Sequence, residues 1–338
     1  MIYKNVELYN VEEVFETKDG IQFSRVPNKV REKLNNNAKT RALMPAGCEI
    51  RFNLKSEKAK ITMKAKKEIA KYNGICEIYF GDFFNTWYFI NENPLEIEVQ
   101  YPDDLYKLEE LASRKKLKFD PKLIRILLPH IVDLIIIEME GDFQIPEKTQ
   151  TPDVKFLAYG SSITHGAFSI IPSYTYVARI AHILGIDAIN LGLGGGCHLE
   201  KEIADYIAKR DDWKFAVFEL GVNMVGGFEV EEFKKRVDYF VEKIVKEKSE
   251  KYLFFVDMFP FYMDFDNQKK QKKFREIVKN KVKEINKENV IHISGVKVLK
   301  DIKGLTADRI HPSISGFEEI ASNLTNILKK YIFKKKNK

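Results

Sequence analysis

The pattern of apolar and polar positions changes along the chain, and its first part favours β-strands. In residues 48–54 and 58–66, apolar and polar side chains alternate one by one. A period of two is typical of strands with one face in the core and one face in water. Further short apolar runs, separated by turn signals and without a strong helix between them, predict an accessory β-sandwich over residues 1–150. These strands are expected at 75–80, 86–90, 95–101, 123–128 and 134–139, and the charged run 103–116 is left open between a short helix and a loop.

From about residue 151 the pattern alternates between strand-like and helical segments. The last helical segment is the clearest, because Phe317, Ile320 and Leu324 fall on one face. Strands that alternate with helices pair in parallel, with helices on both sides, so we expect a five-stranded α/β domain over residues 151–338. The polar segment 141–153 is the expected linker. Strands are expected at 154–159, 186–191, 215–220, 252–258 and 290–293, and helices at about 174–184, 199–209, 229–247 and 268–287.

The loops that follow these strands carry residues suited to acyl transfer. Ser162 follows the first strand, and the carboxyl ends of parallel strands meet at one edge of a sheet, where ligands bind. A serine hydroxyl is a weak nucleophile until a base removes its proton, and His311 is the candidate base. Asp308, three residues earlier, can bind the other imidazole nitrogen. We therefore expect Ser162, His311 and Asp308 to form the catalytic group.

The same edge of the sheet offers hydrogen-bond donors for a developing oxyanion. The second strand is followed by the glycine-rich loop 192–196, and glycine lets a backbone approach a substrate closely. Asn223 follows the third strand. A tetrahedral intermediate needs donors aimed at its negative oxygen. The candidates are the backbone N–H groups of Ser162 and Gly195 and the side-chain amide of Asn223.

These four blocks, in this order, resemble the SGNH (GDSL-type) hydrolases over residues 154 to about 330. The usual opening of that family is Gly-Asp-Ser, and Ser161 stands in this chain where the aspartate would be. The Gly-Ser-Ser-Ile-Thr variant is similar to two-domain members with a jelly-roll-like β-sandwich in front. The resemblance implies a flavodoxin-like three-layer α/β/α domain. It also implies a serine esterase that removes small acyl groups, above all acetyl, from sugars or xylan fragments through an acyl-enzyme on Ser162.

Other functions of the same fold stay open at this point. One is the hydrolysis of lipids or thioesters, or acyl transfer, and another is a catalytically silent protein that binds carbohydrate. A long apolar groove would support a lipid substrate, whereas a short polar pocket would support an acetylated sugar. If such an apolar groove is present, residues such as Ile170, Ile171, Phe228 and Phe259 would line it.

Composition and charge exclude several classes of protein. Of the 338 residues, 44% are hydrophobic, and no run approaches the roughly 18 apolar residues of a membrane span. The start of the chain lacks an apolar leader, so we expect a cytoplasmic protein. The cysteines Cys48, Cys76 and Cys197 form no CxxC pair and are expected to be buried free thiols. The net charge of +7 comes in part from a lysine-rich tail rather than a basic face, which argues against a nucleic-acid partner.

The expected partner is a small acylated carbohydrate, a homo-oligomer is compatible with the sequence, and no cofactor or metal is expected. The loop 192–196 does not fit G-x-G-x-x-G, because the third glycine position falls on Cys197. No His-Cys-carboxylate cluster has the spacing of metal ligands. His165 is not expected to be the base, since no carboxylate lies at a short orienting spacing from it. The aromatic cluster within residues 80–89 is interpreted as core and turn packing.

Overall fold

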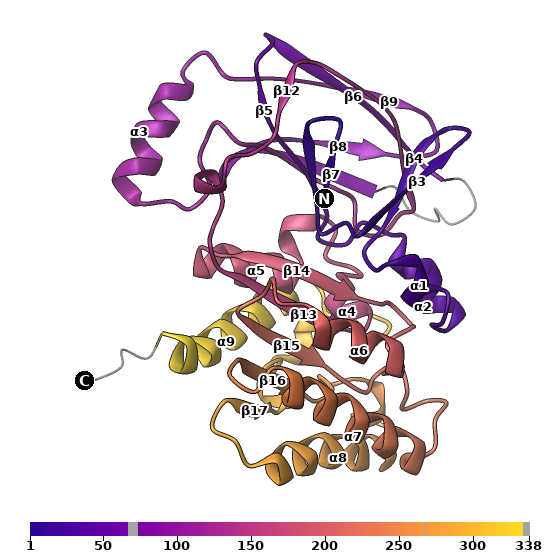
Figure 1. The fold of residues 1–338 in the computed structure, drawn as a ribbon. Helices are drawn as coiled ribbons and strands as arrows, with labels where there is room; N and C mark the ends of the chain where they lie inside the picture. Colours follow the sequence, from indigo (N-terminus) through magenta and orange to yellow (C-terminus); the bar gives the residue numbers. More distant parts are fainter. Residues whose placement is uncertain (67–73, 267, 334–338) are drawn as a thin grey trace.

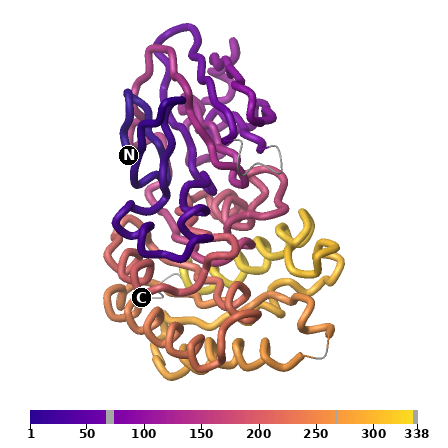
Figure 2. Tube along the Cα trace, turned by 90° about the vertical axis from the view of Figure 1, so that its right-hand side faces the viewer, coloured from indigo at the N-terminus to yellow at the C-terminus, as the bar shows by residue number. Residues whose placement is uncertain are grey.

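The computed structural model describes residues 1–66, 74–266 and 268–333. Antiparallel sheets from the first part of the chain lie above the helices and the parallel sheet of the second part (Figure 1). A view at right angles shows the same two regions stacked along the long axis of the molecule (Figure 2). The predicted fold, an all-β sandwich followed by an α/β layer structure, is confirmed.

Two antiparallel sheets pack face to face in the first region. Their strands are β1 (Ile2–Tyr3), β2 (Val6–Tyr9), β3 (Glu13–Thr17), β4 (Gly20–Ser24), β5 (Glu49–Leu54), β6 (Lys58–Ala65), β7 (Gly74–Phe80), β8 (Phe83–Ile90), β9 (Leu95–Gln100), β10 (Ile124–Leu127), β11 (Leu134–Glu140) and β12 (Phe143–Gln144). One sheet has the order β1-β2-β5-β10-β7-β8, with β12 beside β5, and the other has the order β3-β4-β11-β6-β9. Ile50 and Ile126 from the first sheet and Ile61 and Ile136 from the second share one hydrophobic cluster, which is the core of the sandwich.

The sequence pattern does not predict the strands β1 to β4. Each has two to five residues, which is too short for an alternation to stand out. Lys4 and Asn5 have positive φ angles of 46° and 62°, the geometry of a tight two-residue hairpin turn. The charged run 103–116, left open between helix and loop, contains the helix α3 (Leu105–Lys115).

The interpretation of the aromatic cluster as core and turn packing is wrong for three of its residues. Phe80 is buried, but Phe84, Trp87 and Phe89 are 52%, 49% and 53% exposed. They lie on β8, the edge strand of its sheet, and the rings of Trp87 and Phe89 meet edge to face with centroids 4.8 Å apart. Trp87 and Phe89 are two residues apart, so they share the face of β8 that points away from the core.

The second region is built on the parallel strands β13 (Lys155–Gly160), β14 (Asp187–Gly192), β15 (Phe215–Glu219), β16 (Tyr252–Val256) and β17 (Val290–Ile293). They lie in the order β14-β13-β15-β16-β17. This is the flavodoxin-like order, in which ligands bind at the carboxyl ends of the first and third strands, here β13 and β15. The helices α5 (Tyr176–Leu184) and α9 (Ile314–Ile332) pack on one face, and α6 (Lys201–Lys209), α7 (Val230–Glu247) and α8 (Lys270–Ile285) on the other. The three-layer fold with five parallel strands is therefore confirmed for the described residues.

A segment near the start of the chain leaves the sandwich and packs on the second region. It contains the short helices α1 (Asn28–Arg31) and α2 (Asn36–Ala42), of which α1 contacts both α2 and α6 (Figure 1). Ala38 and Ala42 belong to the same hydrophobic cluster as Leu157 of β13. The division of the chain at residue 150 stays a prediction, but this part of the first region contributes to the core of the second.

Buried charges also join the two regions. Arg51 on β5 donates to both carboxylate oxygens of Asp187 on β14, at 2.7 and 3.0 Å, and to Glu49 at 2.7 Å. All three residues are buried. Removing one partner from a buried ion pair typically costs about 3 to 5 kcal/mol, because the other charge is left without compensation in the interior. The interface is thus fixed well enough for side chains from both regions to share a site.

Four smaller expectations have different outcomes. Cys48, Cys76 and Cys197 are free and buried, as expected. The expected linker 141–153 contains β12 and the short helix η1 (Lys148–Gln150). No helix in the described part of the chain has both the length and the apolar character needed to cross a membrane. The end of the lysine-rich tail, residues 334–338, lies outside the described residues.

Candidate active site

Ser162 is held at the carboxyl end of β13 by a turn that requires glycine. β13 ends at Gly160, and the one-turn helix α4 (Ser162–His165) begins two residues later. A Cβ on Gly160 would lie 2.2 Å from the hydroxyl oxygen of Thr164 and 2.6 Å from a carboxylate oxygen of Glu219, so no larger residue fits. The strand, turn and helix expected from the sequence thus present the hydroxyl of Ser162 at the edge of the sheet.

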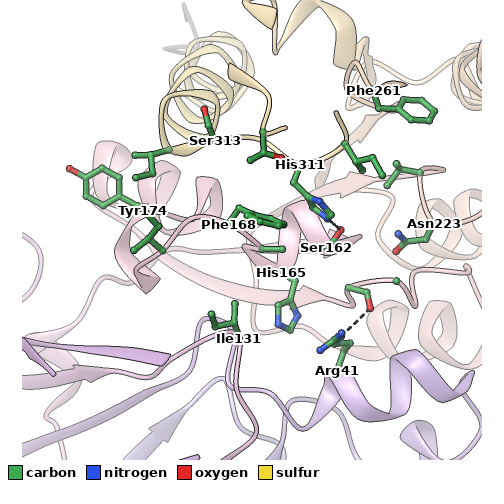
Figure 3. A pocket seen from close by; sticks show the side chains of 18 of the residues that line it. Arg41, Ile131, Ser162, His165, Phe168, Tyr174, Asn223, Phe261, His311 and Ser313 are labelled. Carbon is green, nitrogen blue, oxygen red and sulfur yellow. Dashed lines mark hydrogen bonds between the residues drawn. The ribbon is translucent and has the colours of Figure 1, made fainter. Parts of the chain in front are cut away.

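Ser162, His311 and Asp308 form a continuous chain of hydrogen bonds. Oγ of Ser162 lies 2.7 Å from Nε2 of His311, and Nδ1 of His311 lies 2.7 Å from Oδ2 of Asp308 (Figure 3). Partial burial acts to raise the pKa of Asp308, but hydrogen bonds from the backbone and side chain of His311 outweigh it and lower that pKa to about 2. An ionised carboxylate only accepts, so Nδ1 of His311 carries the proton and Nε2 is left to accept one from Ser162.

The loop that carries the base is held by its own backbone. The other carboxylate oxygen of Asp308 accepts the backbone N–H of Ile310 at 2.8 Å and that of His311 at 3.0 Å. It also accepts the hydroxyl of Thr306 at 2.7 Å. These bonds span two or three residues, so the orientation of His311 follows from a short piece of sequence.

The expected oxyanion donors lie around the same hydroxyl. The N–H groups of Ser162 and Gly195 donate to no acceptor among the described residues. Gly195 has φ of +68° in a turn closed by the N–H of Gly196 and the carbonyl oxygen of Leu193, 2.8 Å apart. Asn223 lines the same pocket, on the side shown in Figure 3. Its Oδ1 accepts the N–H of residue 197 at 3.2 Å, which leaves its NH2 group to donate.

Glu219 is a residue of the site that the sequence analysis does not single out. One of its carboxylate oxygens accepts the backbone N–H of Ser161 at 2.7 Å, the hydroxyl of Ser161 at 2.6 Å and the hydroxyl of Thr164 at 3.1 Å. Burial raises the pKa of Glu219, and the hydrogen bonds from Ser161 oppose that rise. Through these bonds Glu219 holds the turn that carries Ser162. Two of them involve Ser161, which occupies the position of the family's usual aspartate. An acidic residue at the end of the apolar run 215–220 is the signal that could have found it.

His165 lies close to Ser162 in sequence but has a different environment. Its Nε2 lies 2.6 Å from the carbonyl oxygen of His130, and its ring is buried. Burial and the nearby guanidinium of Arg25 hold the pKa of His165 well below its usual range. The imidazole that reaches the hydroxyl of Ser162 is that of His311.

A cavity of about 1500 Å³ opens beside Ser162 and His311, and its walls are mainly apolar. The sandwich contributes to it through β7 and β8, and the segment with α2 contributes as well. Of the four residues expected along an apolar groove, Ile170 is among the described lining residues, whereas Ile171, Phe228 and Phe259 are not. The apolar and aromatic lining consists of Met44, Ile75, Phe89, Ile131, Ala167, Phe168, Ile170, Tyr174, Val222, Val225, Phe261, Tyr262, Ile310 and Ile314.

One wall of the cavity is a strained loop. Phe168 and Ile170 have φ angles of +71° and +69°, and a β-branched residue such as isoleucine rarely adopts this conformation. The ring of Phe168 lies 5.0 Å from the ring of His311, centroid to centroid. Backbone strain of this kind persists where the surroundings hold it, and it is concentrated at functional sites. The loop thus places an aromatic ring against the candidate base.

The rest of the described chain offers no rival centre built on a metal. Among the residues the structure describes, no group of three or more His, Cys, Asp or Glu side chains could hold a metal ion. His292 and Asp257 form a second pair, with 2.8 Å between Nε2 and Oδ2, but neither lines the cavity.

Solved structures with a similar fold extend over nearly the whole chain. The salicylyl-acyltransferase SsfX3 from a tetracycline biosynthetic pathway has a TM-score of 0.77 at 15% identity, over 95% of this chain and 93% of that one. A protein from Bacteroides ovatus described as a GDSL-like lipase has a TM-score of 0.72 at 20% identity, over 97% and 98%. An active-site mutant of a family two carbohydrate esterase from Clostridium thermocellum has a TM-score of 0.65 at 12% identity, over 97% and 98%. At these identities the likeness concerns the fold.

The family of the chain follows from its sequence. Residues 154–329, more than half of the chain, match the model of the GDSL-like lipase/acylhydrolase family. No curated protein matches the chain. The family match covers β13, β14, β15 and the loop with His311, which are the elements next to the candidate catalytic group and oxyanion donors, and it confirms the resemblance drawn from the four blocks. The chain belongs to the GDSL-like lipase/acylhydrolase family and is a carboxylic ester hydrolase.

Proposed function

We propose that the protein is a serine esterase that works through an acyl-enzyme on Ser162. The observation that carries the proposal is the chain of two 2.7 Å hydrogen bonds from Ser162 through His311 to Asp308, at the wall of an apolar cavity. A serine alone is a weak nucleophile, whereas a serine bonded to an oriented neutral imidazole can lose its proton as it attacks.

The first half of the reaction forms the acyl-enzyme. As Oγ of Ser162 bonds to the ester carbonyl carbon, its proton passes to Nε2 of His311. The carbonyl oxygen becomes negative and accepts hydrogen bonds from the N–H groups of Ser162 and Gly195 and from the amide of Asn223. One donor of this kind is typically worth about 3 to 4 kcal/mol in the transition state. The intermediate then breaks its bond to the alcohol oxygen, which leaves with the proton from His311.

The second half returns the serine to its starting state. A water molecule attacks the acyl carbon and gives its proton to Nε2 of His311. The bond between the acyl carbon and Oγ of Ser162 breaks, and Oγ takes that proton back. Asp308 stays ionised and stabilises the imidazolium in both halves, because its pKa of about 2 lies far below neutral pH.

The cavity favours esters with an apolar acyl or alcohol group. Its lining is mainly aliphatic and aromatic, and burying such groups stabilises the complex by about 25 cal/mol per Å² of apolar surface. The second candidate is the acetylated carbohydrate expected from the sequence. The exposed rings of Phe89, Phe168 and Tyr174 in the cavity wall favour it, because aromatic rings can stack on sugar rings, and a carbohydrate esterase is among the structures of similar fold.

The two candidates are separated by one panel of substrates. The full chain is assayed with 4-nitrophenyl acetate, butyrate and octanoate, and with acetylated xylo-oligosaccharides. A kcat/KM that rises with chain length supports the apolar ester, and acetate release from the oligosaccharides without such a rise supports the carbohydrate ester. Transfer of the acyl group to an added alcohol in preference to water would identify an acyltransferase.

The role of Ser162 is tested with a matched serine. Ser162→Ala should abolish activity towards every ester in the panel, whereas Ser249→Ala should keep it, because Ser249 is exposed near the amino end of β16, at the opposite edge of the sheet. Equal activity of the Ser162→Ala variant and the unaltered chain would refute the acyl-enzyme. Binding of acetylated oligosaccharide by the unaltered chain without release of acetate would favour the silent binding protein.

A further inference from the structure

Three side chains from the segment with α2 hold three successive carbonyl groups of the glycine loop. Nδ2 of Asn35 donates to the carbonyl oxygen of Gly196 at 2.9 Å, and Nδ2 of Asn37 donates to that of Gly195 at 3.1 Å. Nε of Arg41 donates to that of Gly194 at 3.3 Å. Arg41 lies next to the loop in the close view of the pocket (Figure 3). The segment is more than 150 residues away from the loop in sequence and belongs to the sandwich half of the chain.

The bond from Arg41 sets the direction of a candidate oxyanion donor. In a trans peptide unit the C=O and the following N–H point in opposite directions, because the unit is planar. The carbonyl of Gly194 points towards Arg41, so the N–H of Gly195 in the same unit points away from it. That N–H meets no acceptor among the described residues, and Gly194 and Gly195 both line the cavity that holds Ser162. Arg41 therefore fixes a peptide whose donor is free for a ligand.

The bond from Asn35 affects the candidate donor Asn223 indirectly, through the backbone N–H of Cys197. It holds the carbonyl of Gly196, so the N–H of Cys197 points to the opposite side of that peptide unit. That N–H donates to Oδ1 of Asn223 at 3.2 Å. With its oxygen occupied, the amide of Asn223 can turn only its NH2 group towards the substrate. The contacts of Asn35, Asn37 and Arg41 with the glycine loop, called the row below, thus orient both Gly195 and Asn223.

The row is anchored by a buried arginine. Arg25 is 1% exposed, and its Nη2 donates to the carbonyl oxygen of Arg41 at 2.6 Å and to that of Gly192 at 2.9 Å. One nitrogen therefore links the end of α2 to the start of the glycine loop. Nδ2 of Asn10 adds a second link, since it donates to the carbonyl oxygens of Ala46 and Asn190 at 3.1 and 3.0 Å. The spacing between segment and loop is fixed from both sides.

From these contacts we infer that Asn35, Asn37 and Arg41 are positioning residues that hold the oxyanion hole in its active geometry. The inference rests on the proposed function and goes beyond it, because it assigns part of the catalytic geometry to the sandwich half of the chain. A donor acts only when it already points to where the negative oxygen forms. Loss of the row should therefore slow the chemical step and leave the binding of the ester almost unchanged.

Arg41 has a rival role, which the test must separate. No carboxylate pairs with its guanidinium among the described residues, and Arg41 lines the cavity, so it could instead bind an anionic group of the substrate. The two roles differ in the atom that they require. Positioning needs a donor at Nε, whereas binding of an anion needs the positive charge.

Two substitutions at residue 41 distinguish a donor from a charge. Arg41→Gln places an amide nitrogen at the position of Nε and removes the charge, and Arg41→Met keeps the length without a donor. For Arg41→Met we expect kcat to fall about tenfold or more, a fraction of the 10²–10³-fold loss seen when a donor itself is removed, with KM changed less than twofold. Arg41→Gln should regain most of that loss. Asn37→Ala should lower kcat in the same way by a smaller factor, because Asn37 is exposed.

The affinities of two inhibitors separate a role in the oxyanion hole from a general structural role. A trifluoromethyl ketone forms a tetrahedral oxyanion adduct with the serine, whereas the corresponding alcohol binds without one. The affinity of Arg41→Met for the ketone should fall by the same factor as kcat/KM, and its affinity for the alcohol should not change. Lys39→Ala is the matched control, because Lys39 lies on α2 and pairs with Glu32 at 3.5 Å, away from the loop.

The inference is overturned if Arg41→Gln is as slow as Arg41→Met, or if the loss appears in KM for anionic esters alone. It is also overturned if both inhibitors lose affinity equally, since that result indicates general distortion of the pocket. Failure of the proposed function looks different: Ser162→Ala would then be as active as the unaltered chain, whatever the result at residue 41, and the inference would fall with it.

Discussion

The two sides of the cavity are built in opposite ways. The base side is local: Asp308 orients His311 three residues away, and the same carboxylate accepts backbone N–H groups within its own loop. The oxyanion side is non-local, because the glycine loop is held by Asn37 and Arg41, which come from the other half of the chain. The base therefore depends on a short loop, whereas the oxyanion hole depends on how two regions dock. Perturbing each side separately tests this difference.

The largest loss should follow removal of the base. His311→Ala should lower kcat by about 10⁴-fold or more, because no other side chain among the described residues forms a hydrogen bond with Oγ of Ser162. His292→Ala is the control, since His292 also pairs with an aspartate, at 2.8 Å, but does not line the cavity. Steady-state kinetics with 4-nitrophenyl butyrate measures both variants. A comparable loss of kcat in the two variants would contradict the role of His311 as the base for Ser162.

The next loss should come from the residue that orients the base. Asp308→Asn should lower kcat by about 10³-fold, because an amide no longer selects the tautomer with its proton on Nδ1. The pKa of Asp308 is lowered to about 2, so its carboxylate stabilises the fold above the usual aspartate value of about 3.9, and this contribution is lost as the pH falls towards 2. Thermal unfolding between pH 2 and pH 6 should show less acid sensitivity in the variant. At neutral pH the variant should melt somewhat below the unaltered chain, because it lacks the stabilisation from the ionised carboxylate, and solvent screening of the exposed loop keeps this difference small.

Breaking the docking should affect stability as well as activity. Arg25→Met removes a charged donor from the carbonyl oxygens of Met44, Asn190 and Gly192, each of which keeps another hydrogen-bond contact. Hydrogen bonds from a charged donor are typically worth about 1.5 to 3 kcal/mol each, so the free energy of unfolding should fall by at least about 2 kcal/mol. Urea unfolding and kcat are measured on the same preparations. Loss of activity without loss of stability would contradict the view that this side of the cavity depends on docking.

The smallest effect should be a change in pH dependence at Glu219. Burial raises the pKa of Glu219 in the folded protein. The folded state therefore binds the proton more tightly than the unfolded chain, and stability falls as the pH rises from the usual glutamate value of about 4.3 through the raised one. Glu219→Gln removes this slope while keeping an oxygen that can accept from Ser161. Melting temperatures between pH 4 and pH 8 should decline less in the variant, and an unchanged slope would show that Glu219 does not titrate there.

The same difference explains how much of the molecule can be predicted from sequence. Strand and helix periods predict the layers of the second region, and the order of the blocks points to Ser162, Asp308 and His311, which the structure brings together. The contacts of Asn37 and Arg41 leave no periodic signal, because they depend on the tertiary position of two short helices. The exposure of Trp87 and Phe89 does not follow from the sequence, because aromatic composition does not show which face of an edge strand is covered. Glu219 left a local signal, an acid closing an apolar run, that could have been used.

The buried guanidinium of Arg25 has a consequence for how such proteins can be recombined. A chimera cut at residue 154, where the family match begins, would separate the glycine loop from the side chains that aim its amides. The isolated second half could still carry its serine, histidine and aspartate, yet its anion-binding backbone would be free to reorient. Modular exchange of the leading sandwich between relatives should therefore succeed only when residues 25–44 travel with the hydrolase half.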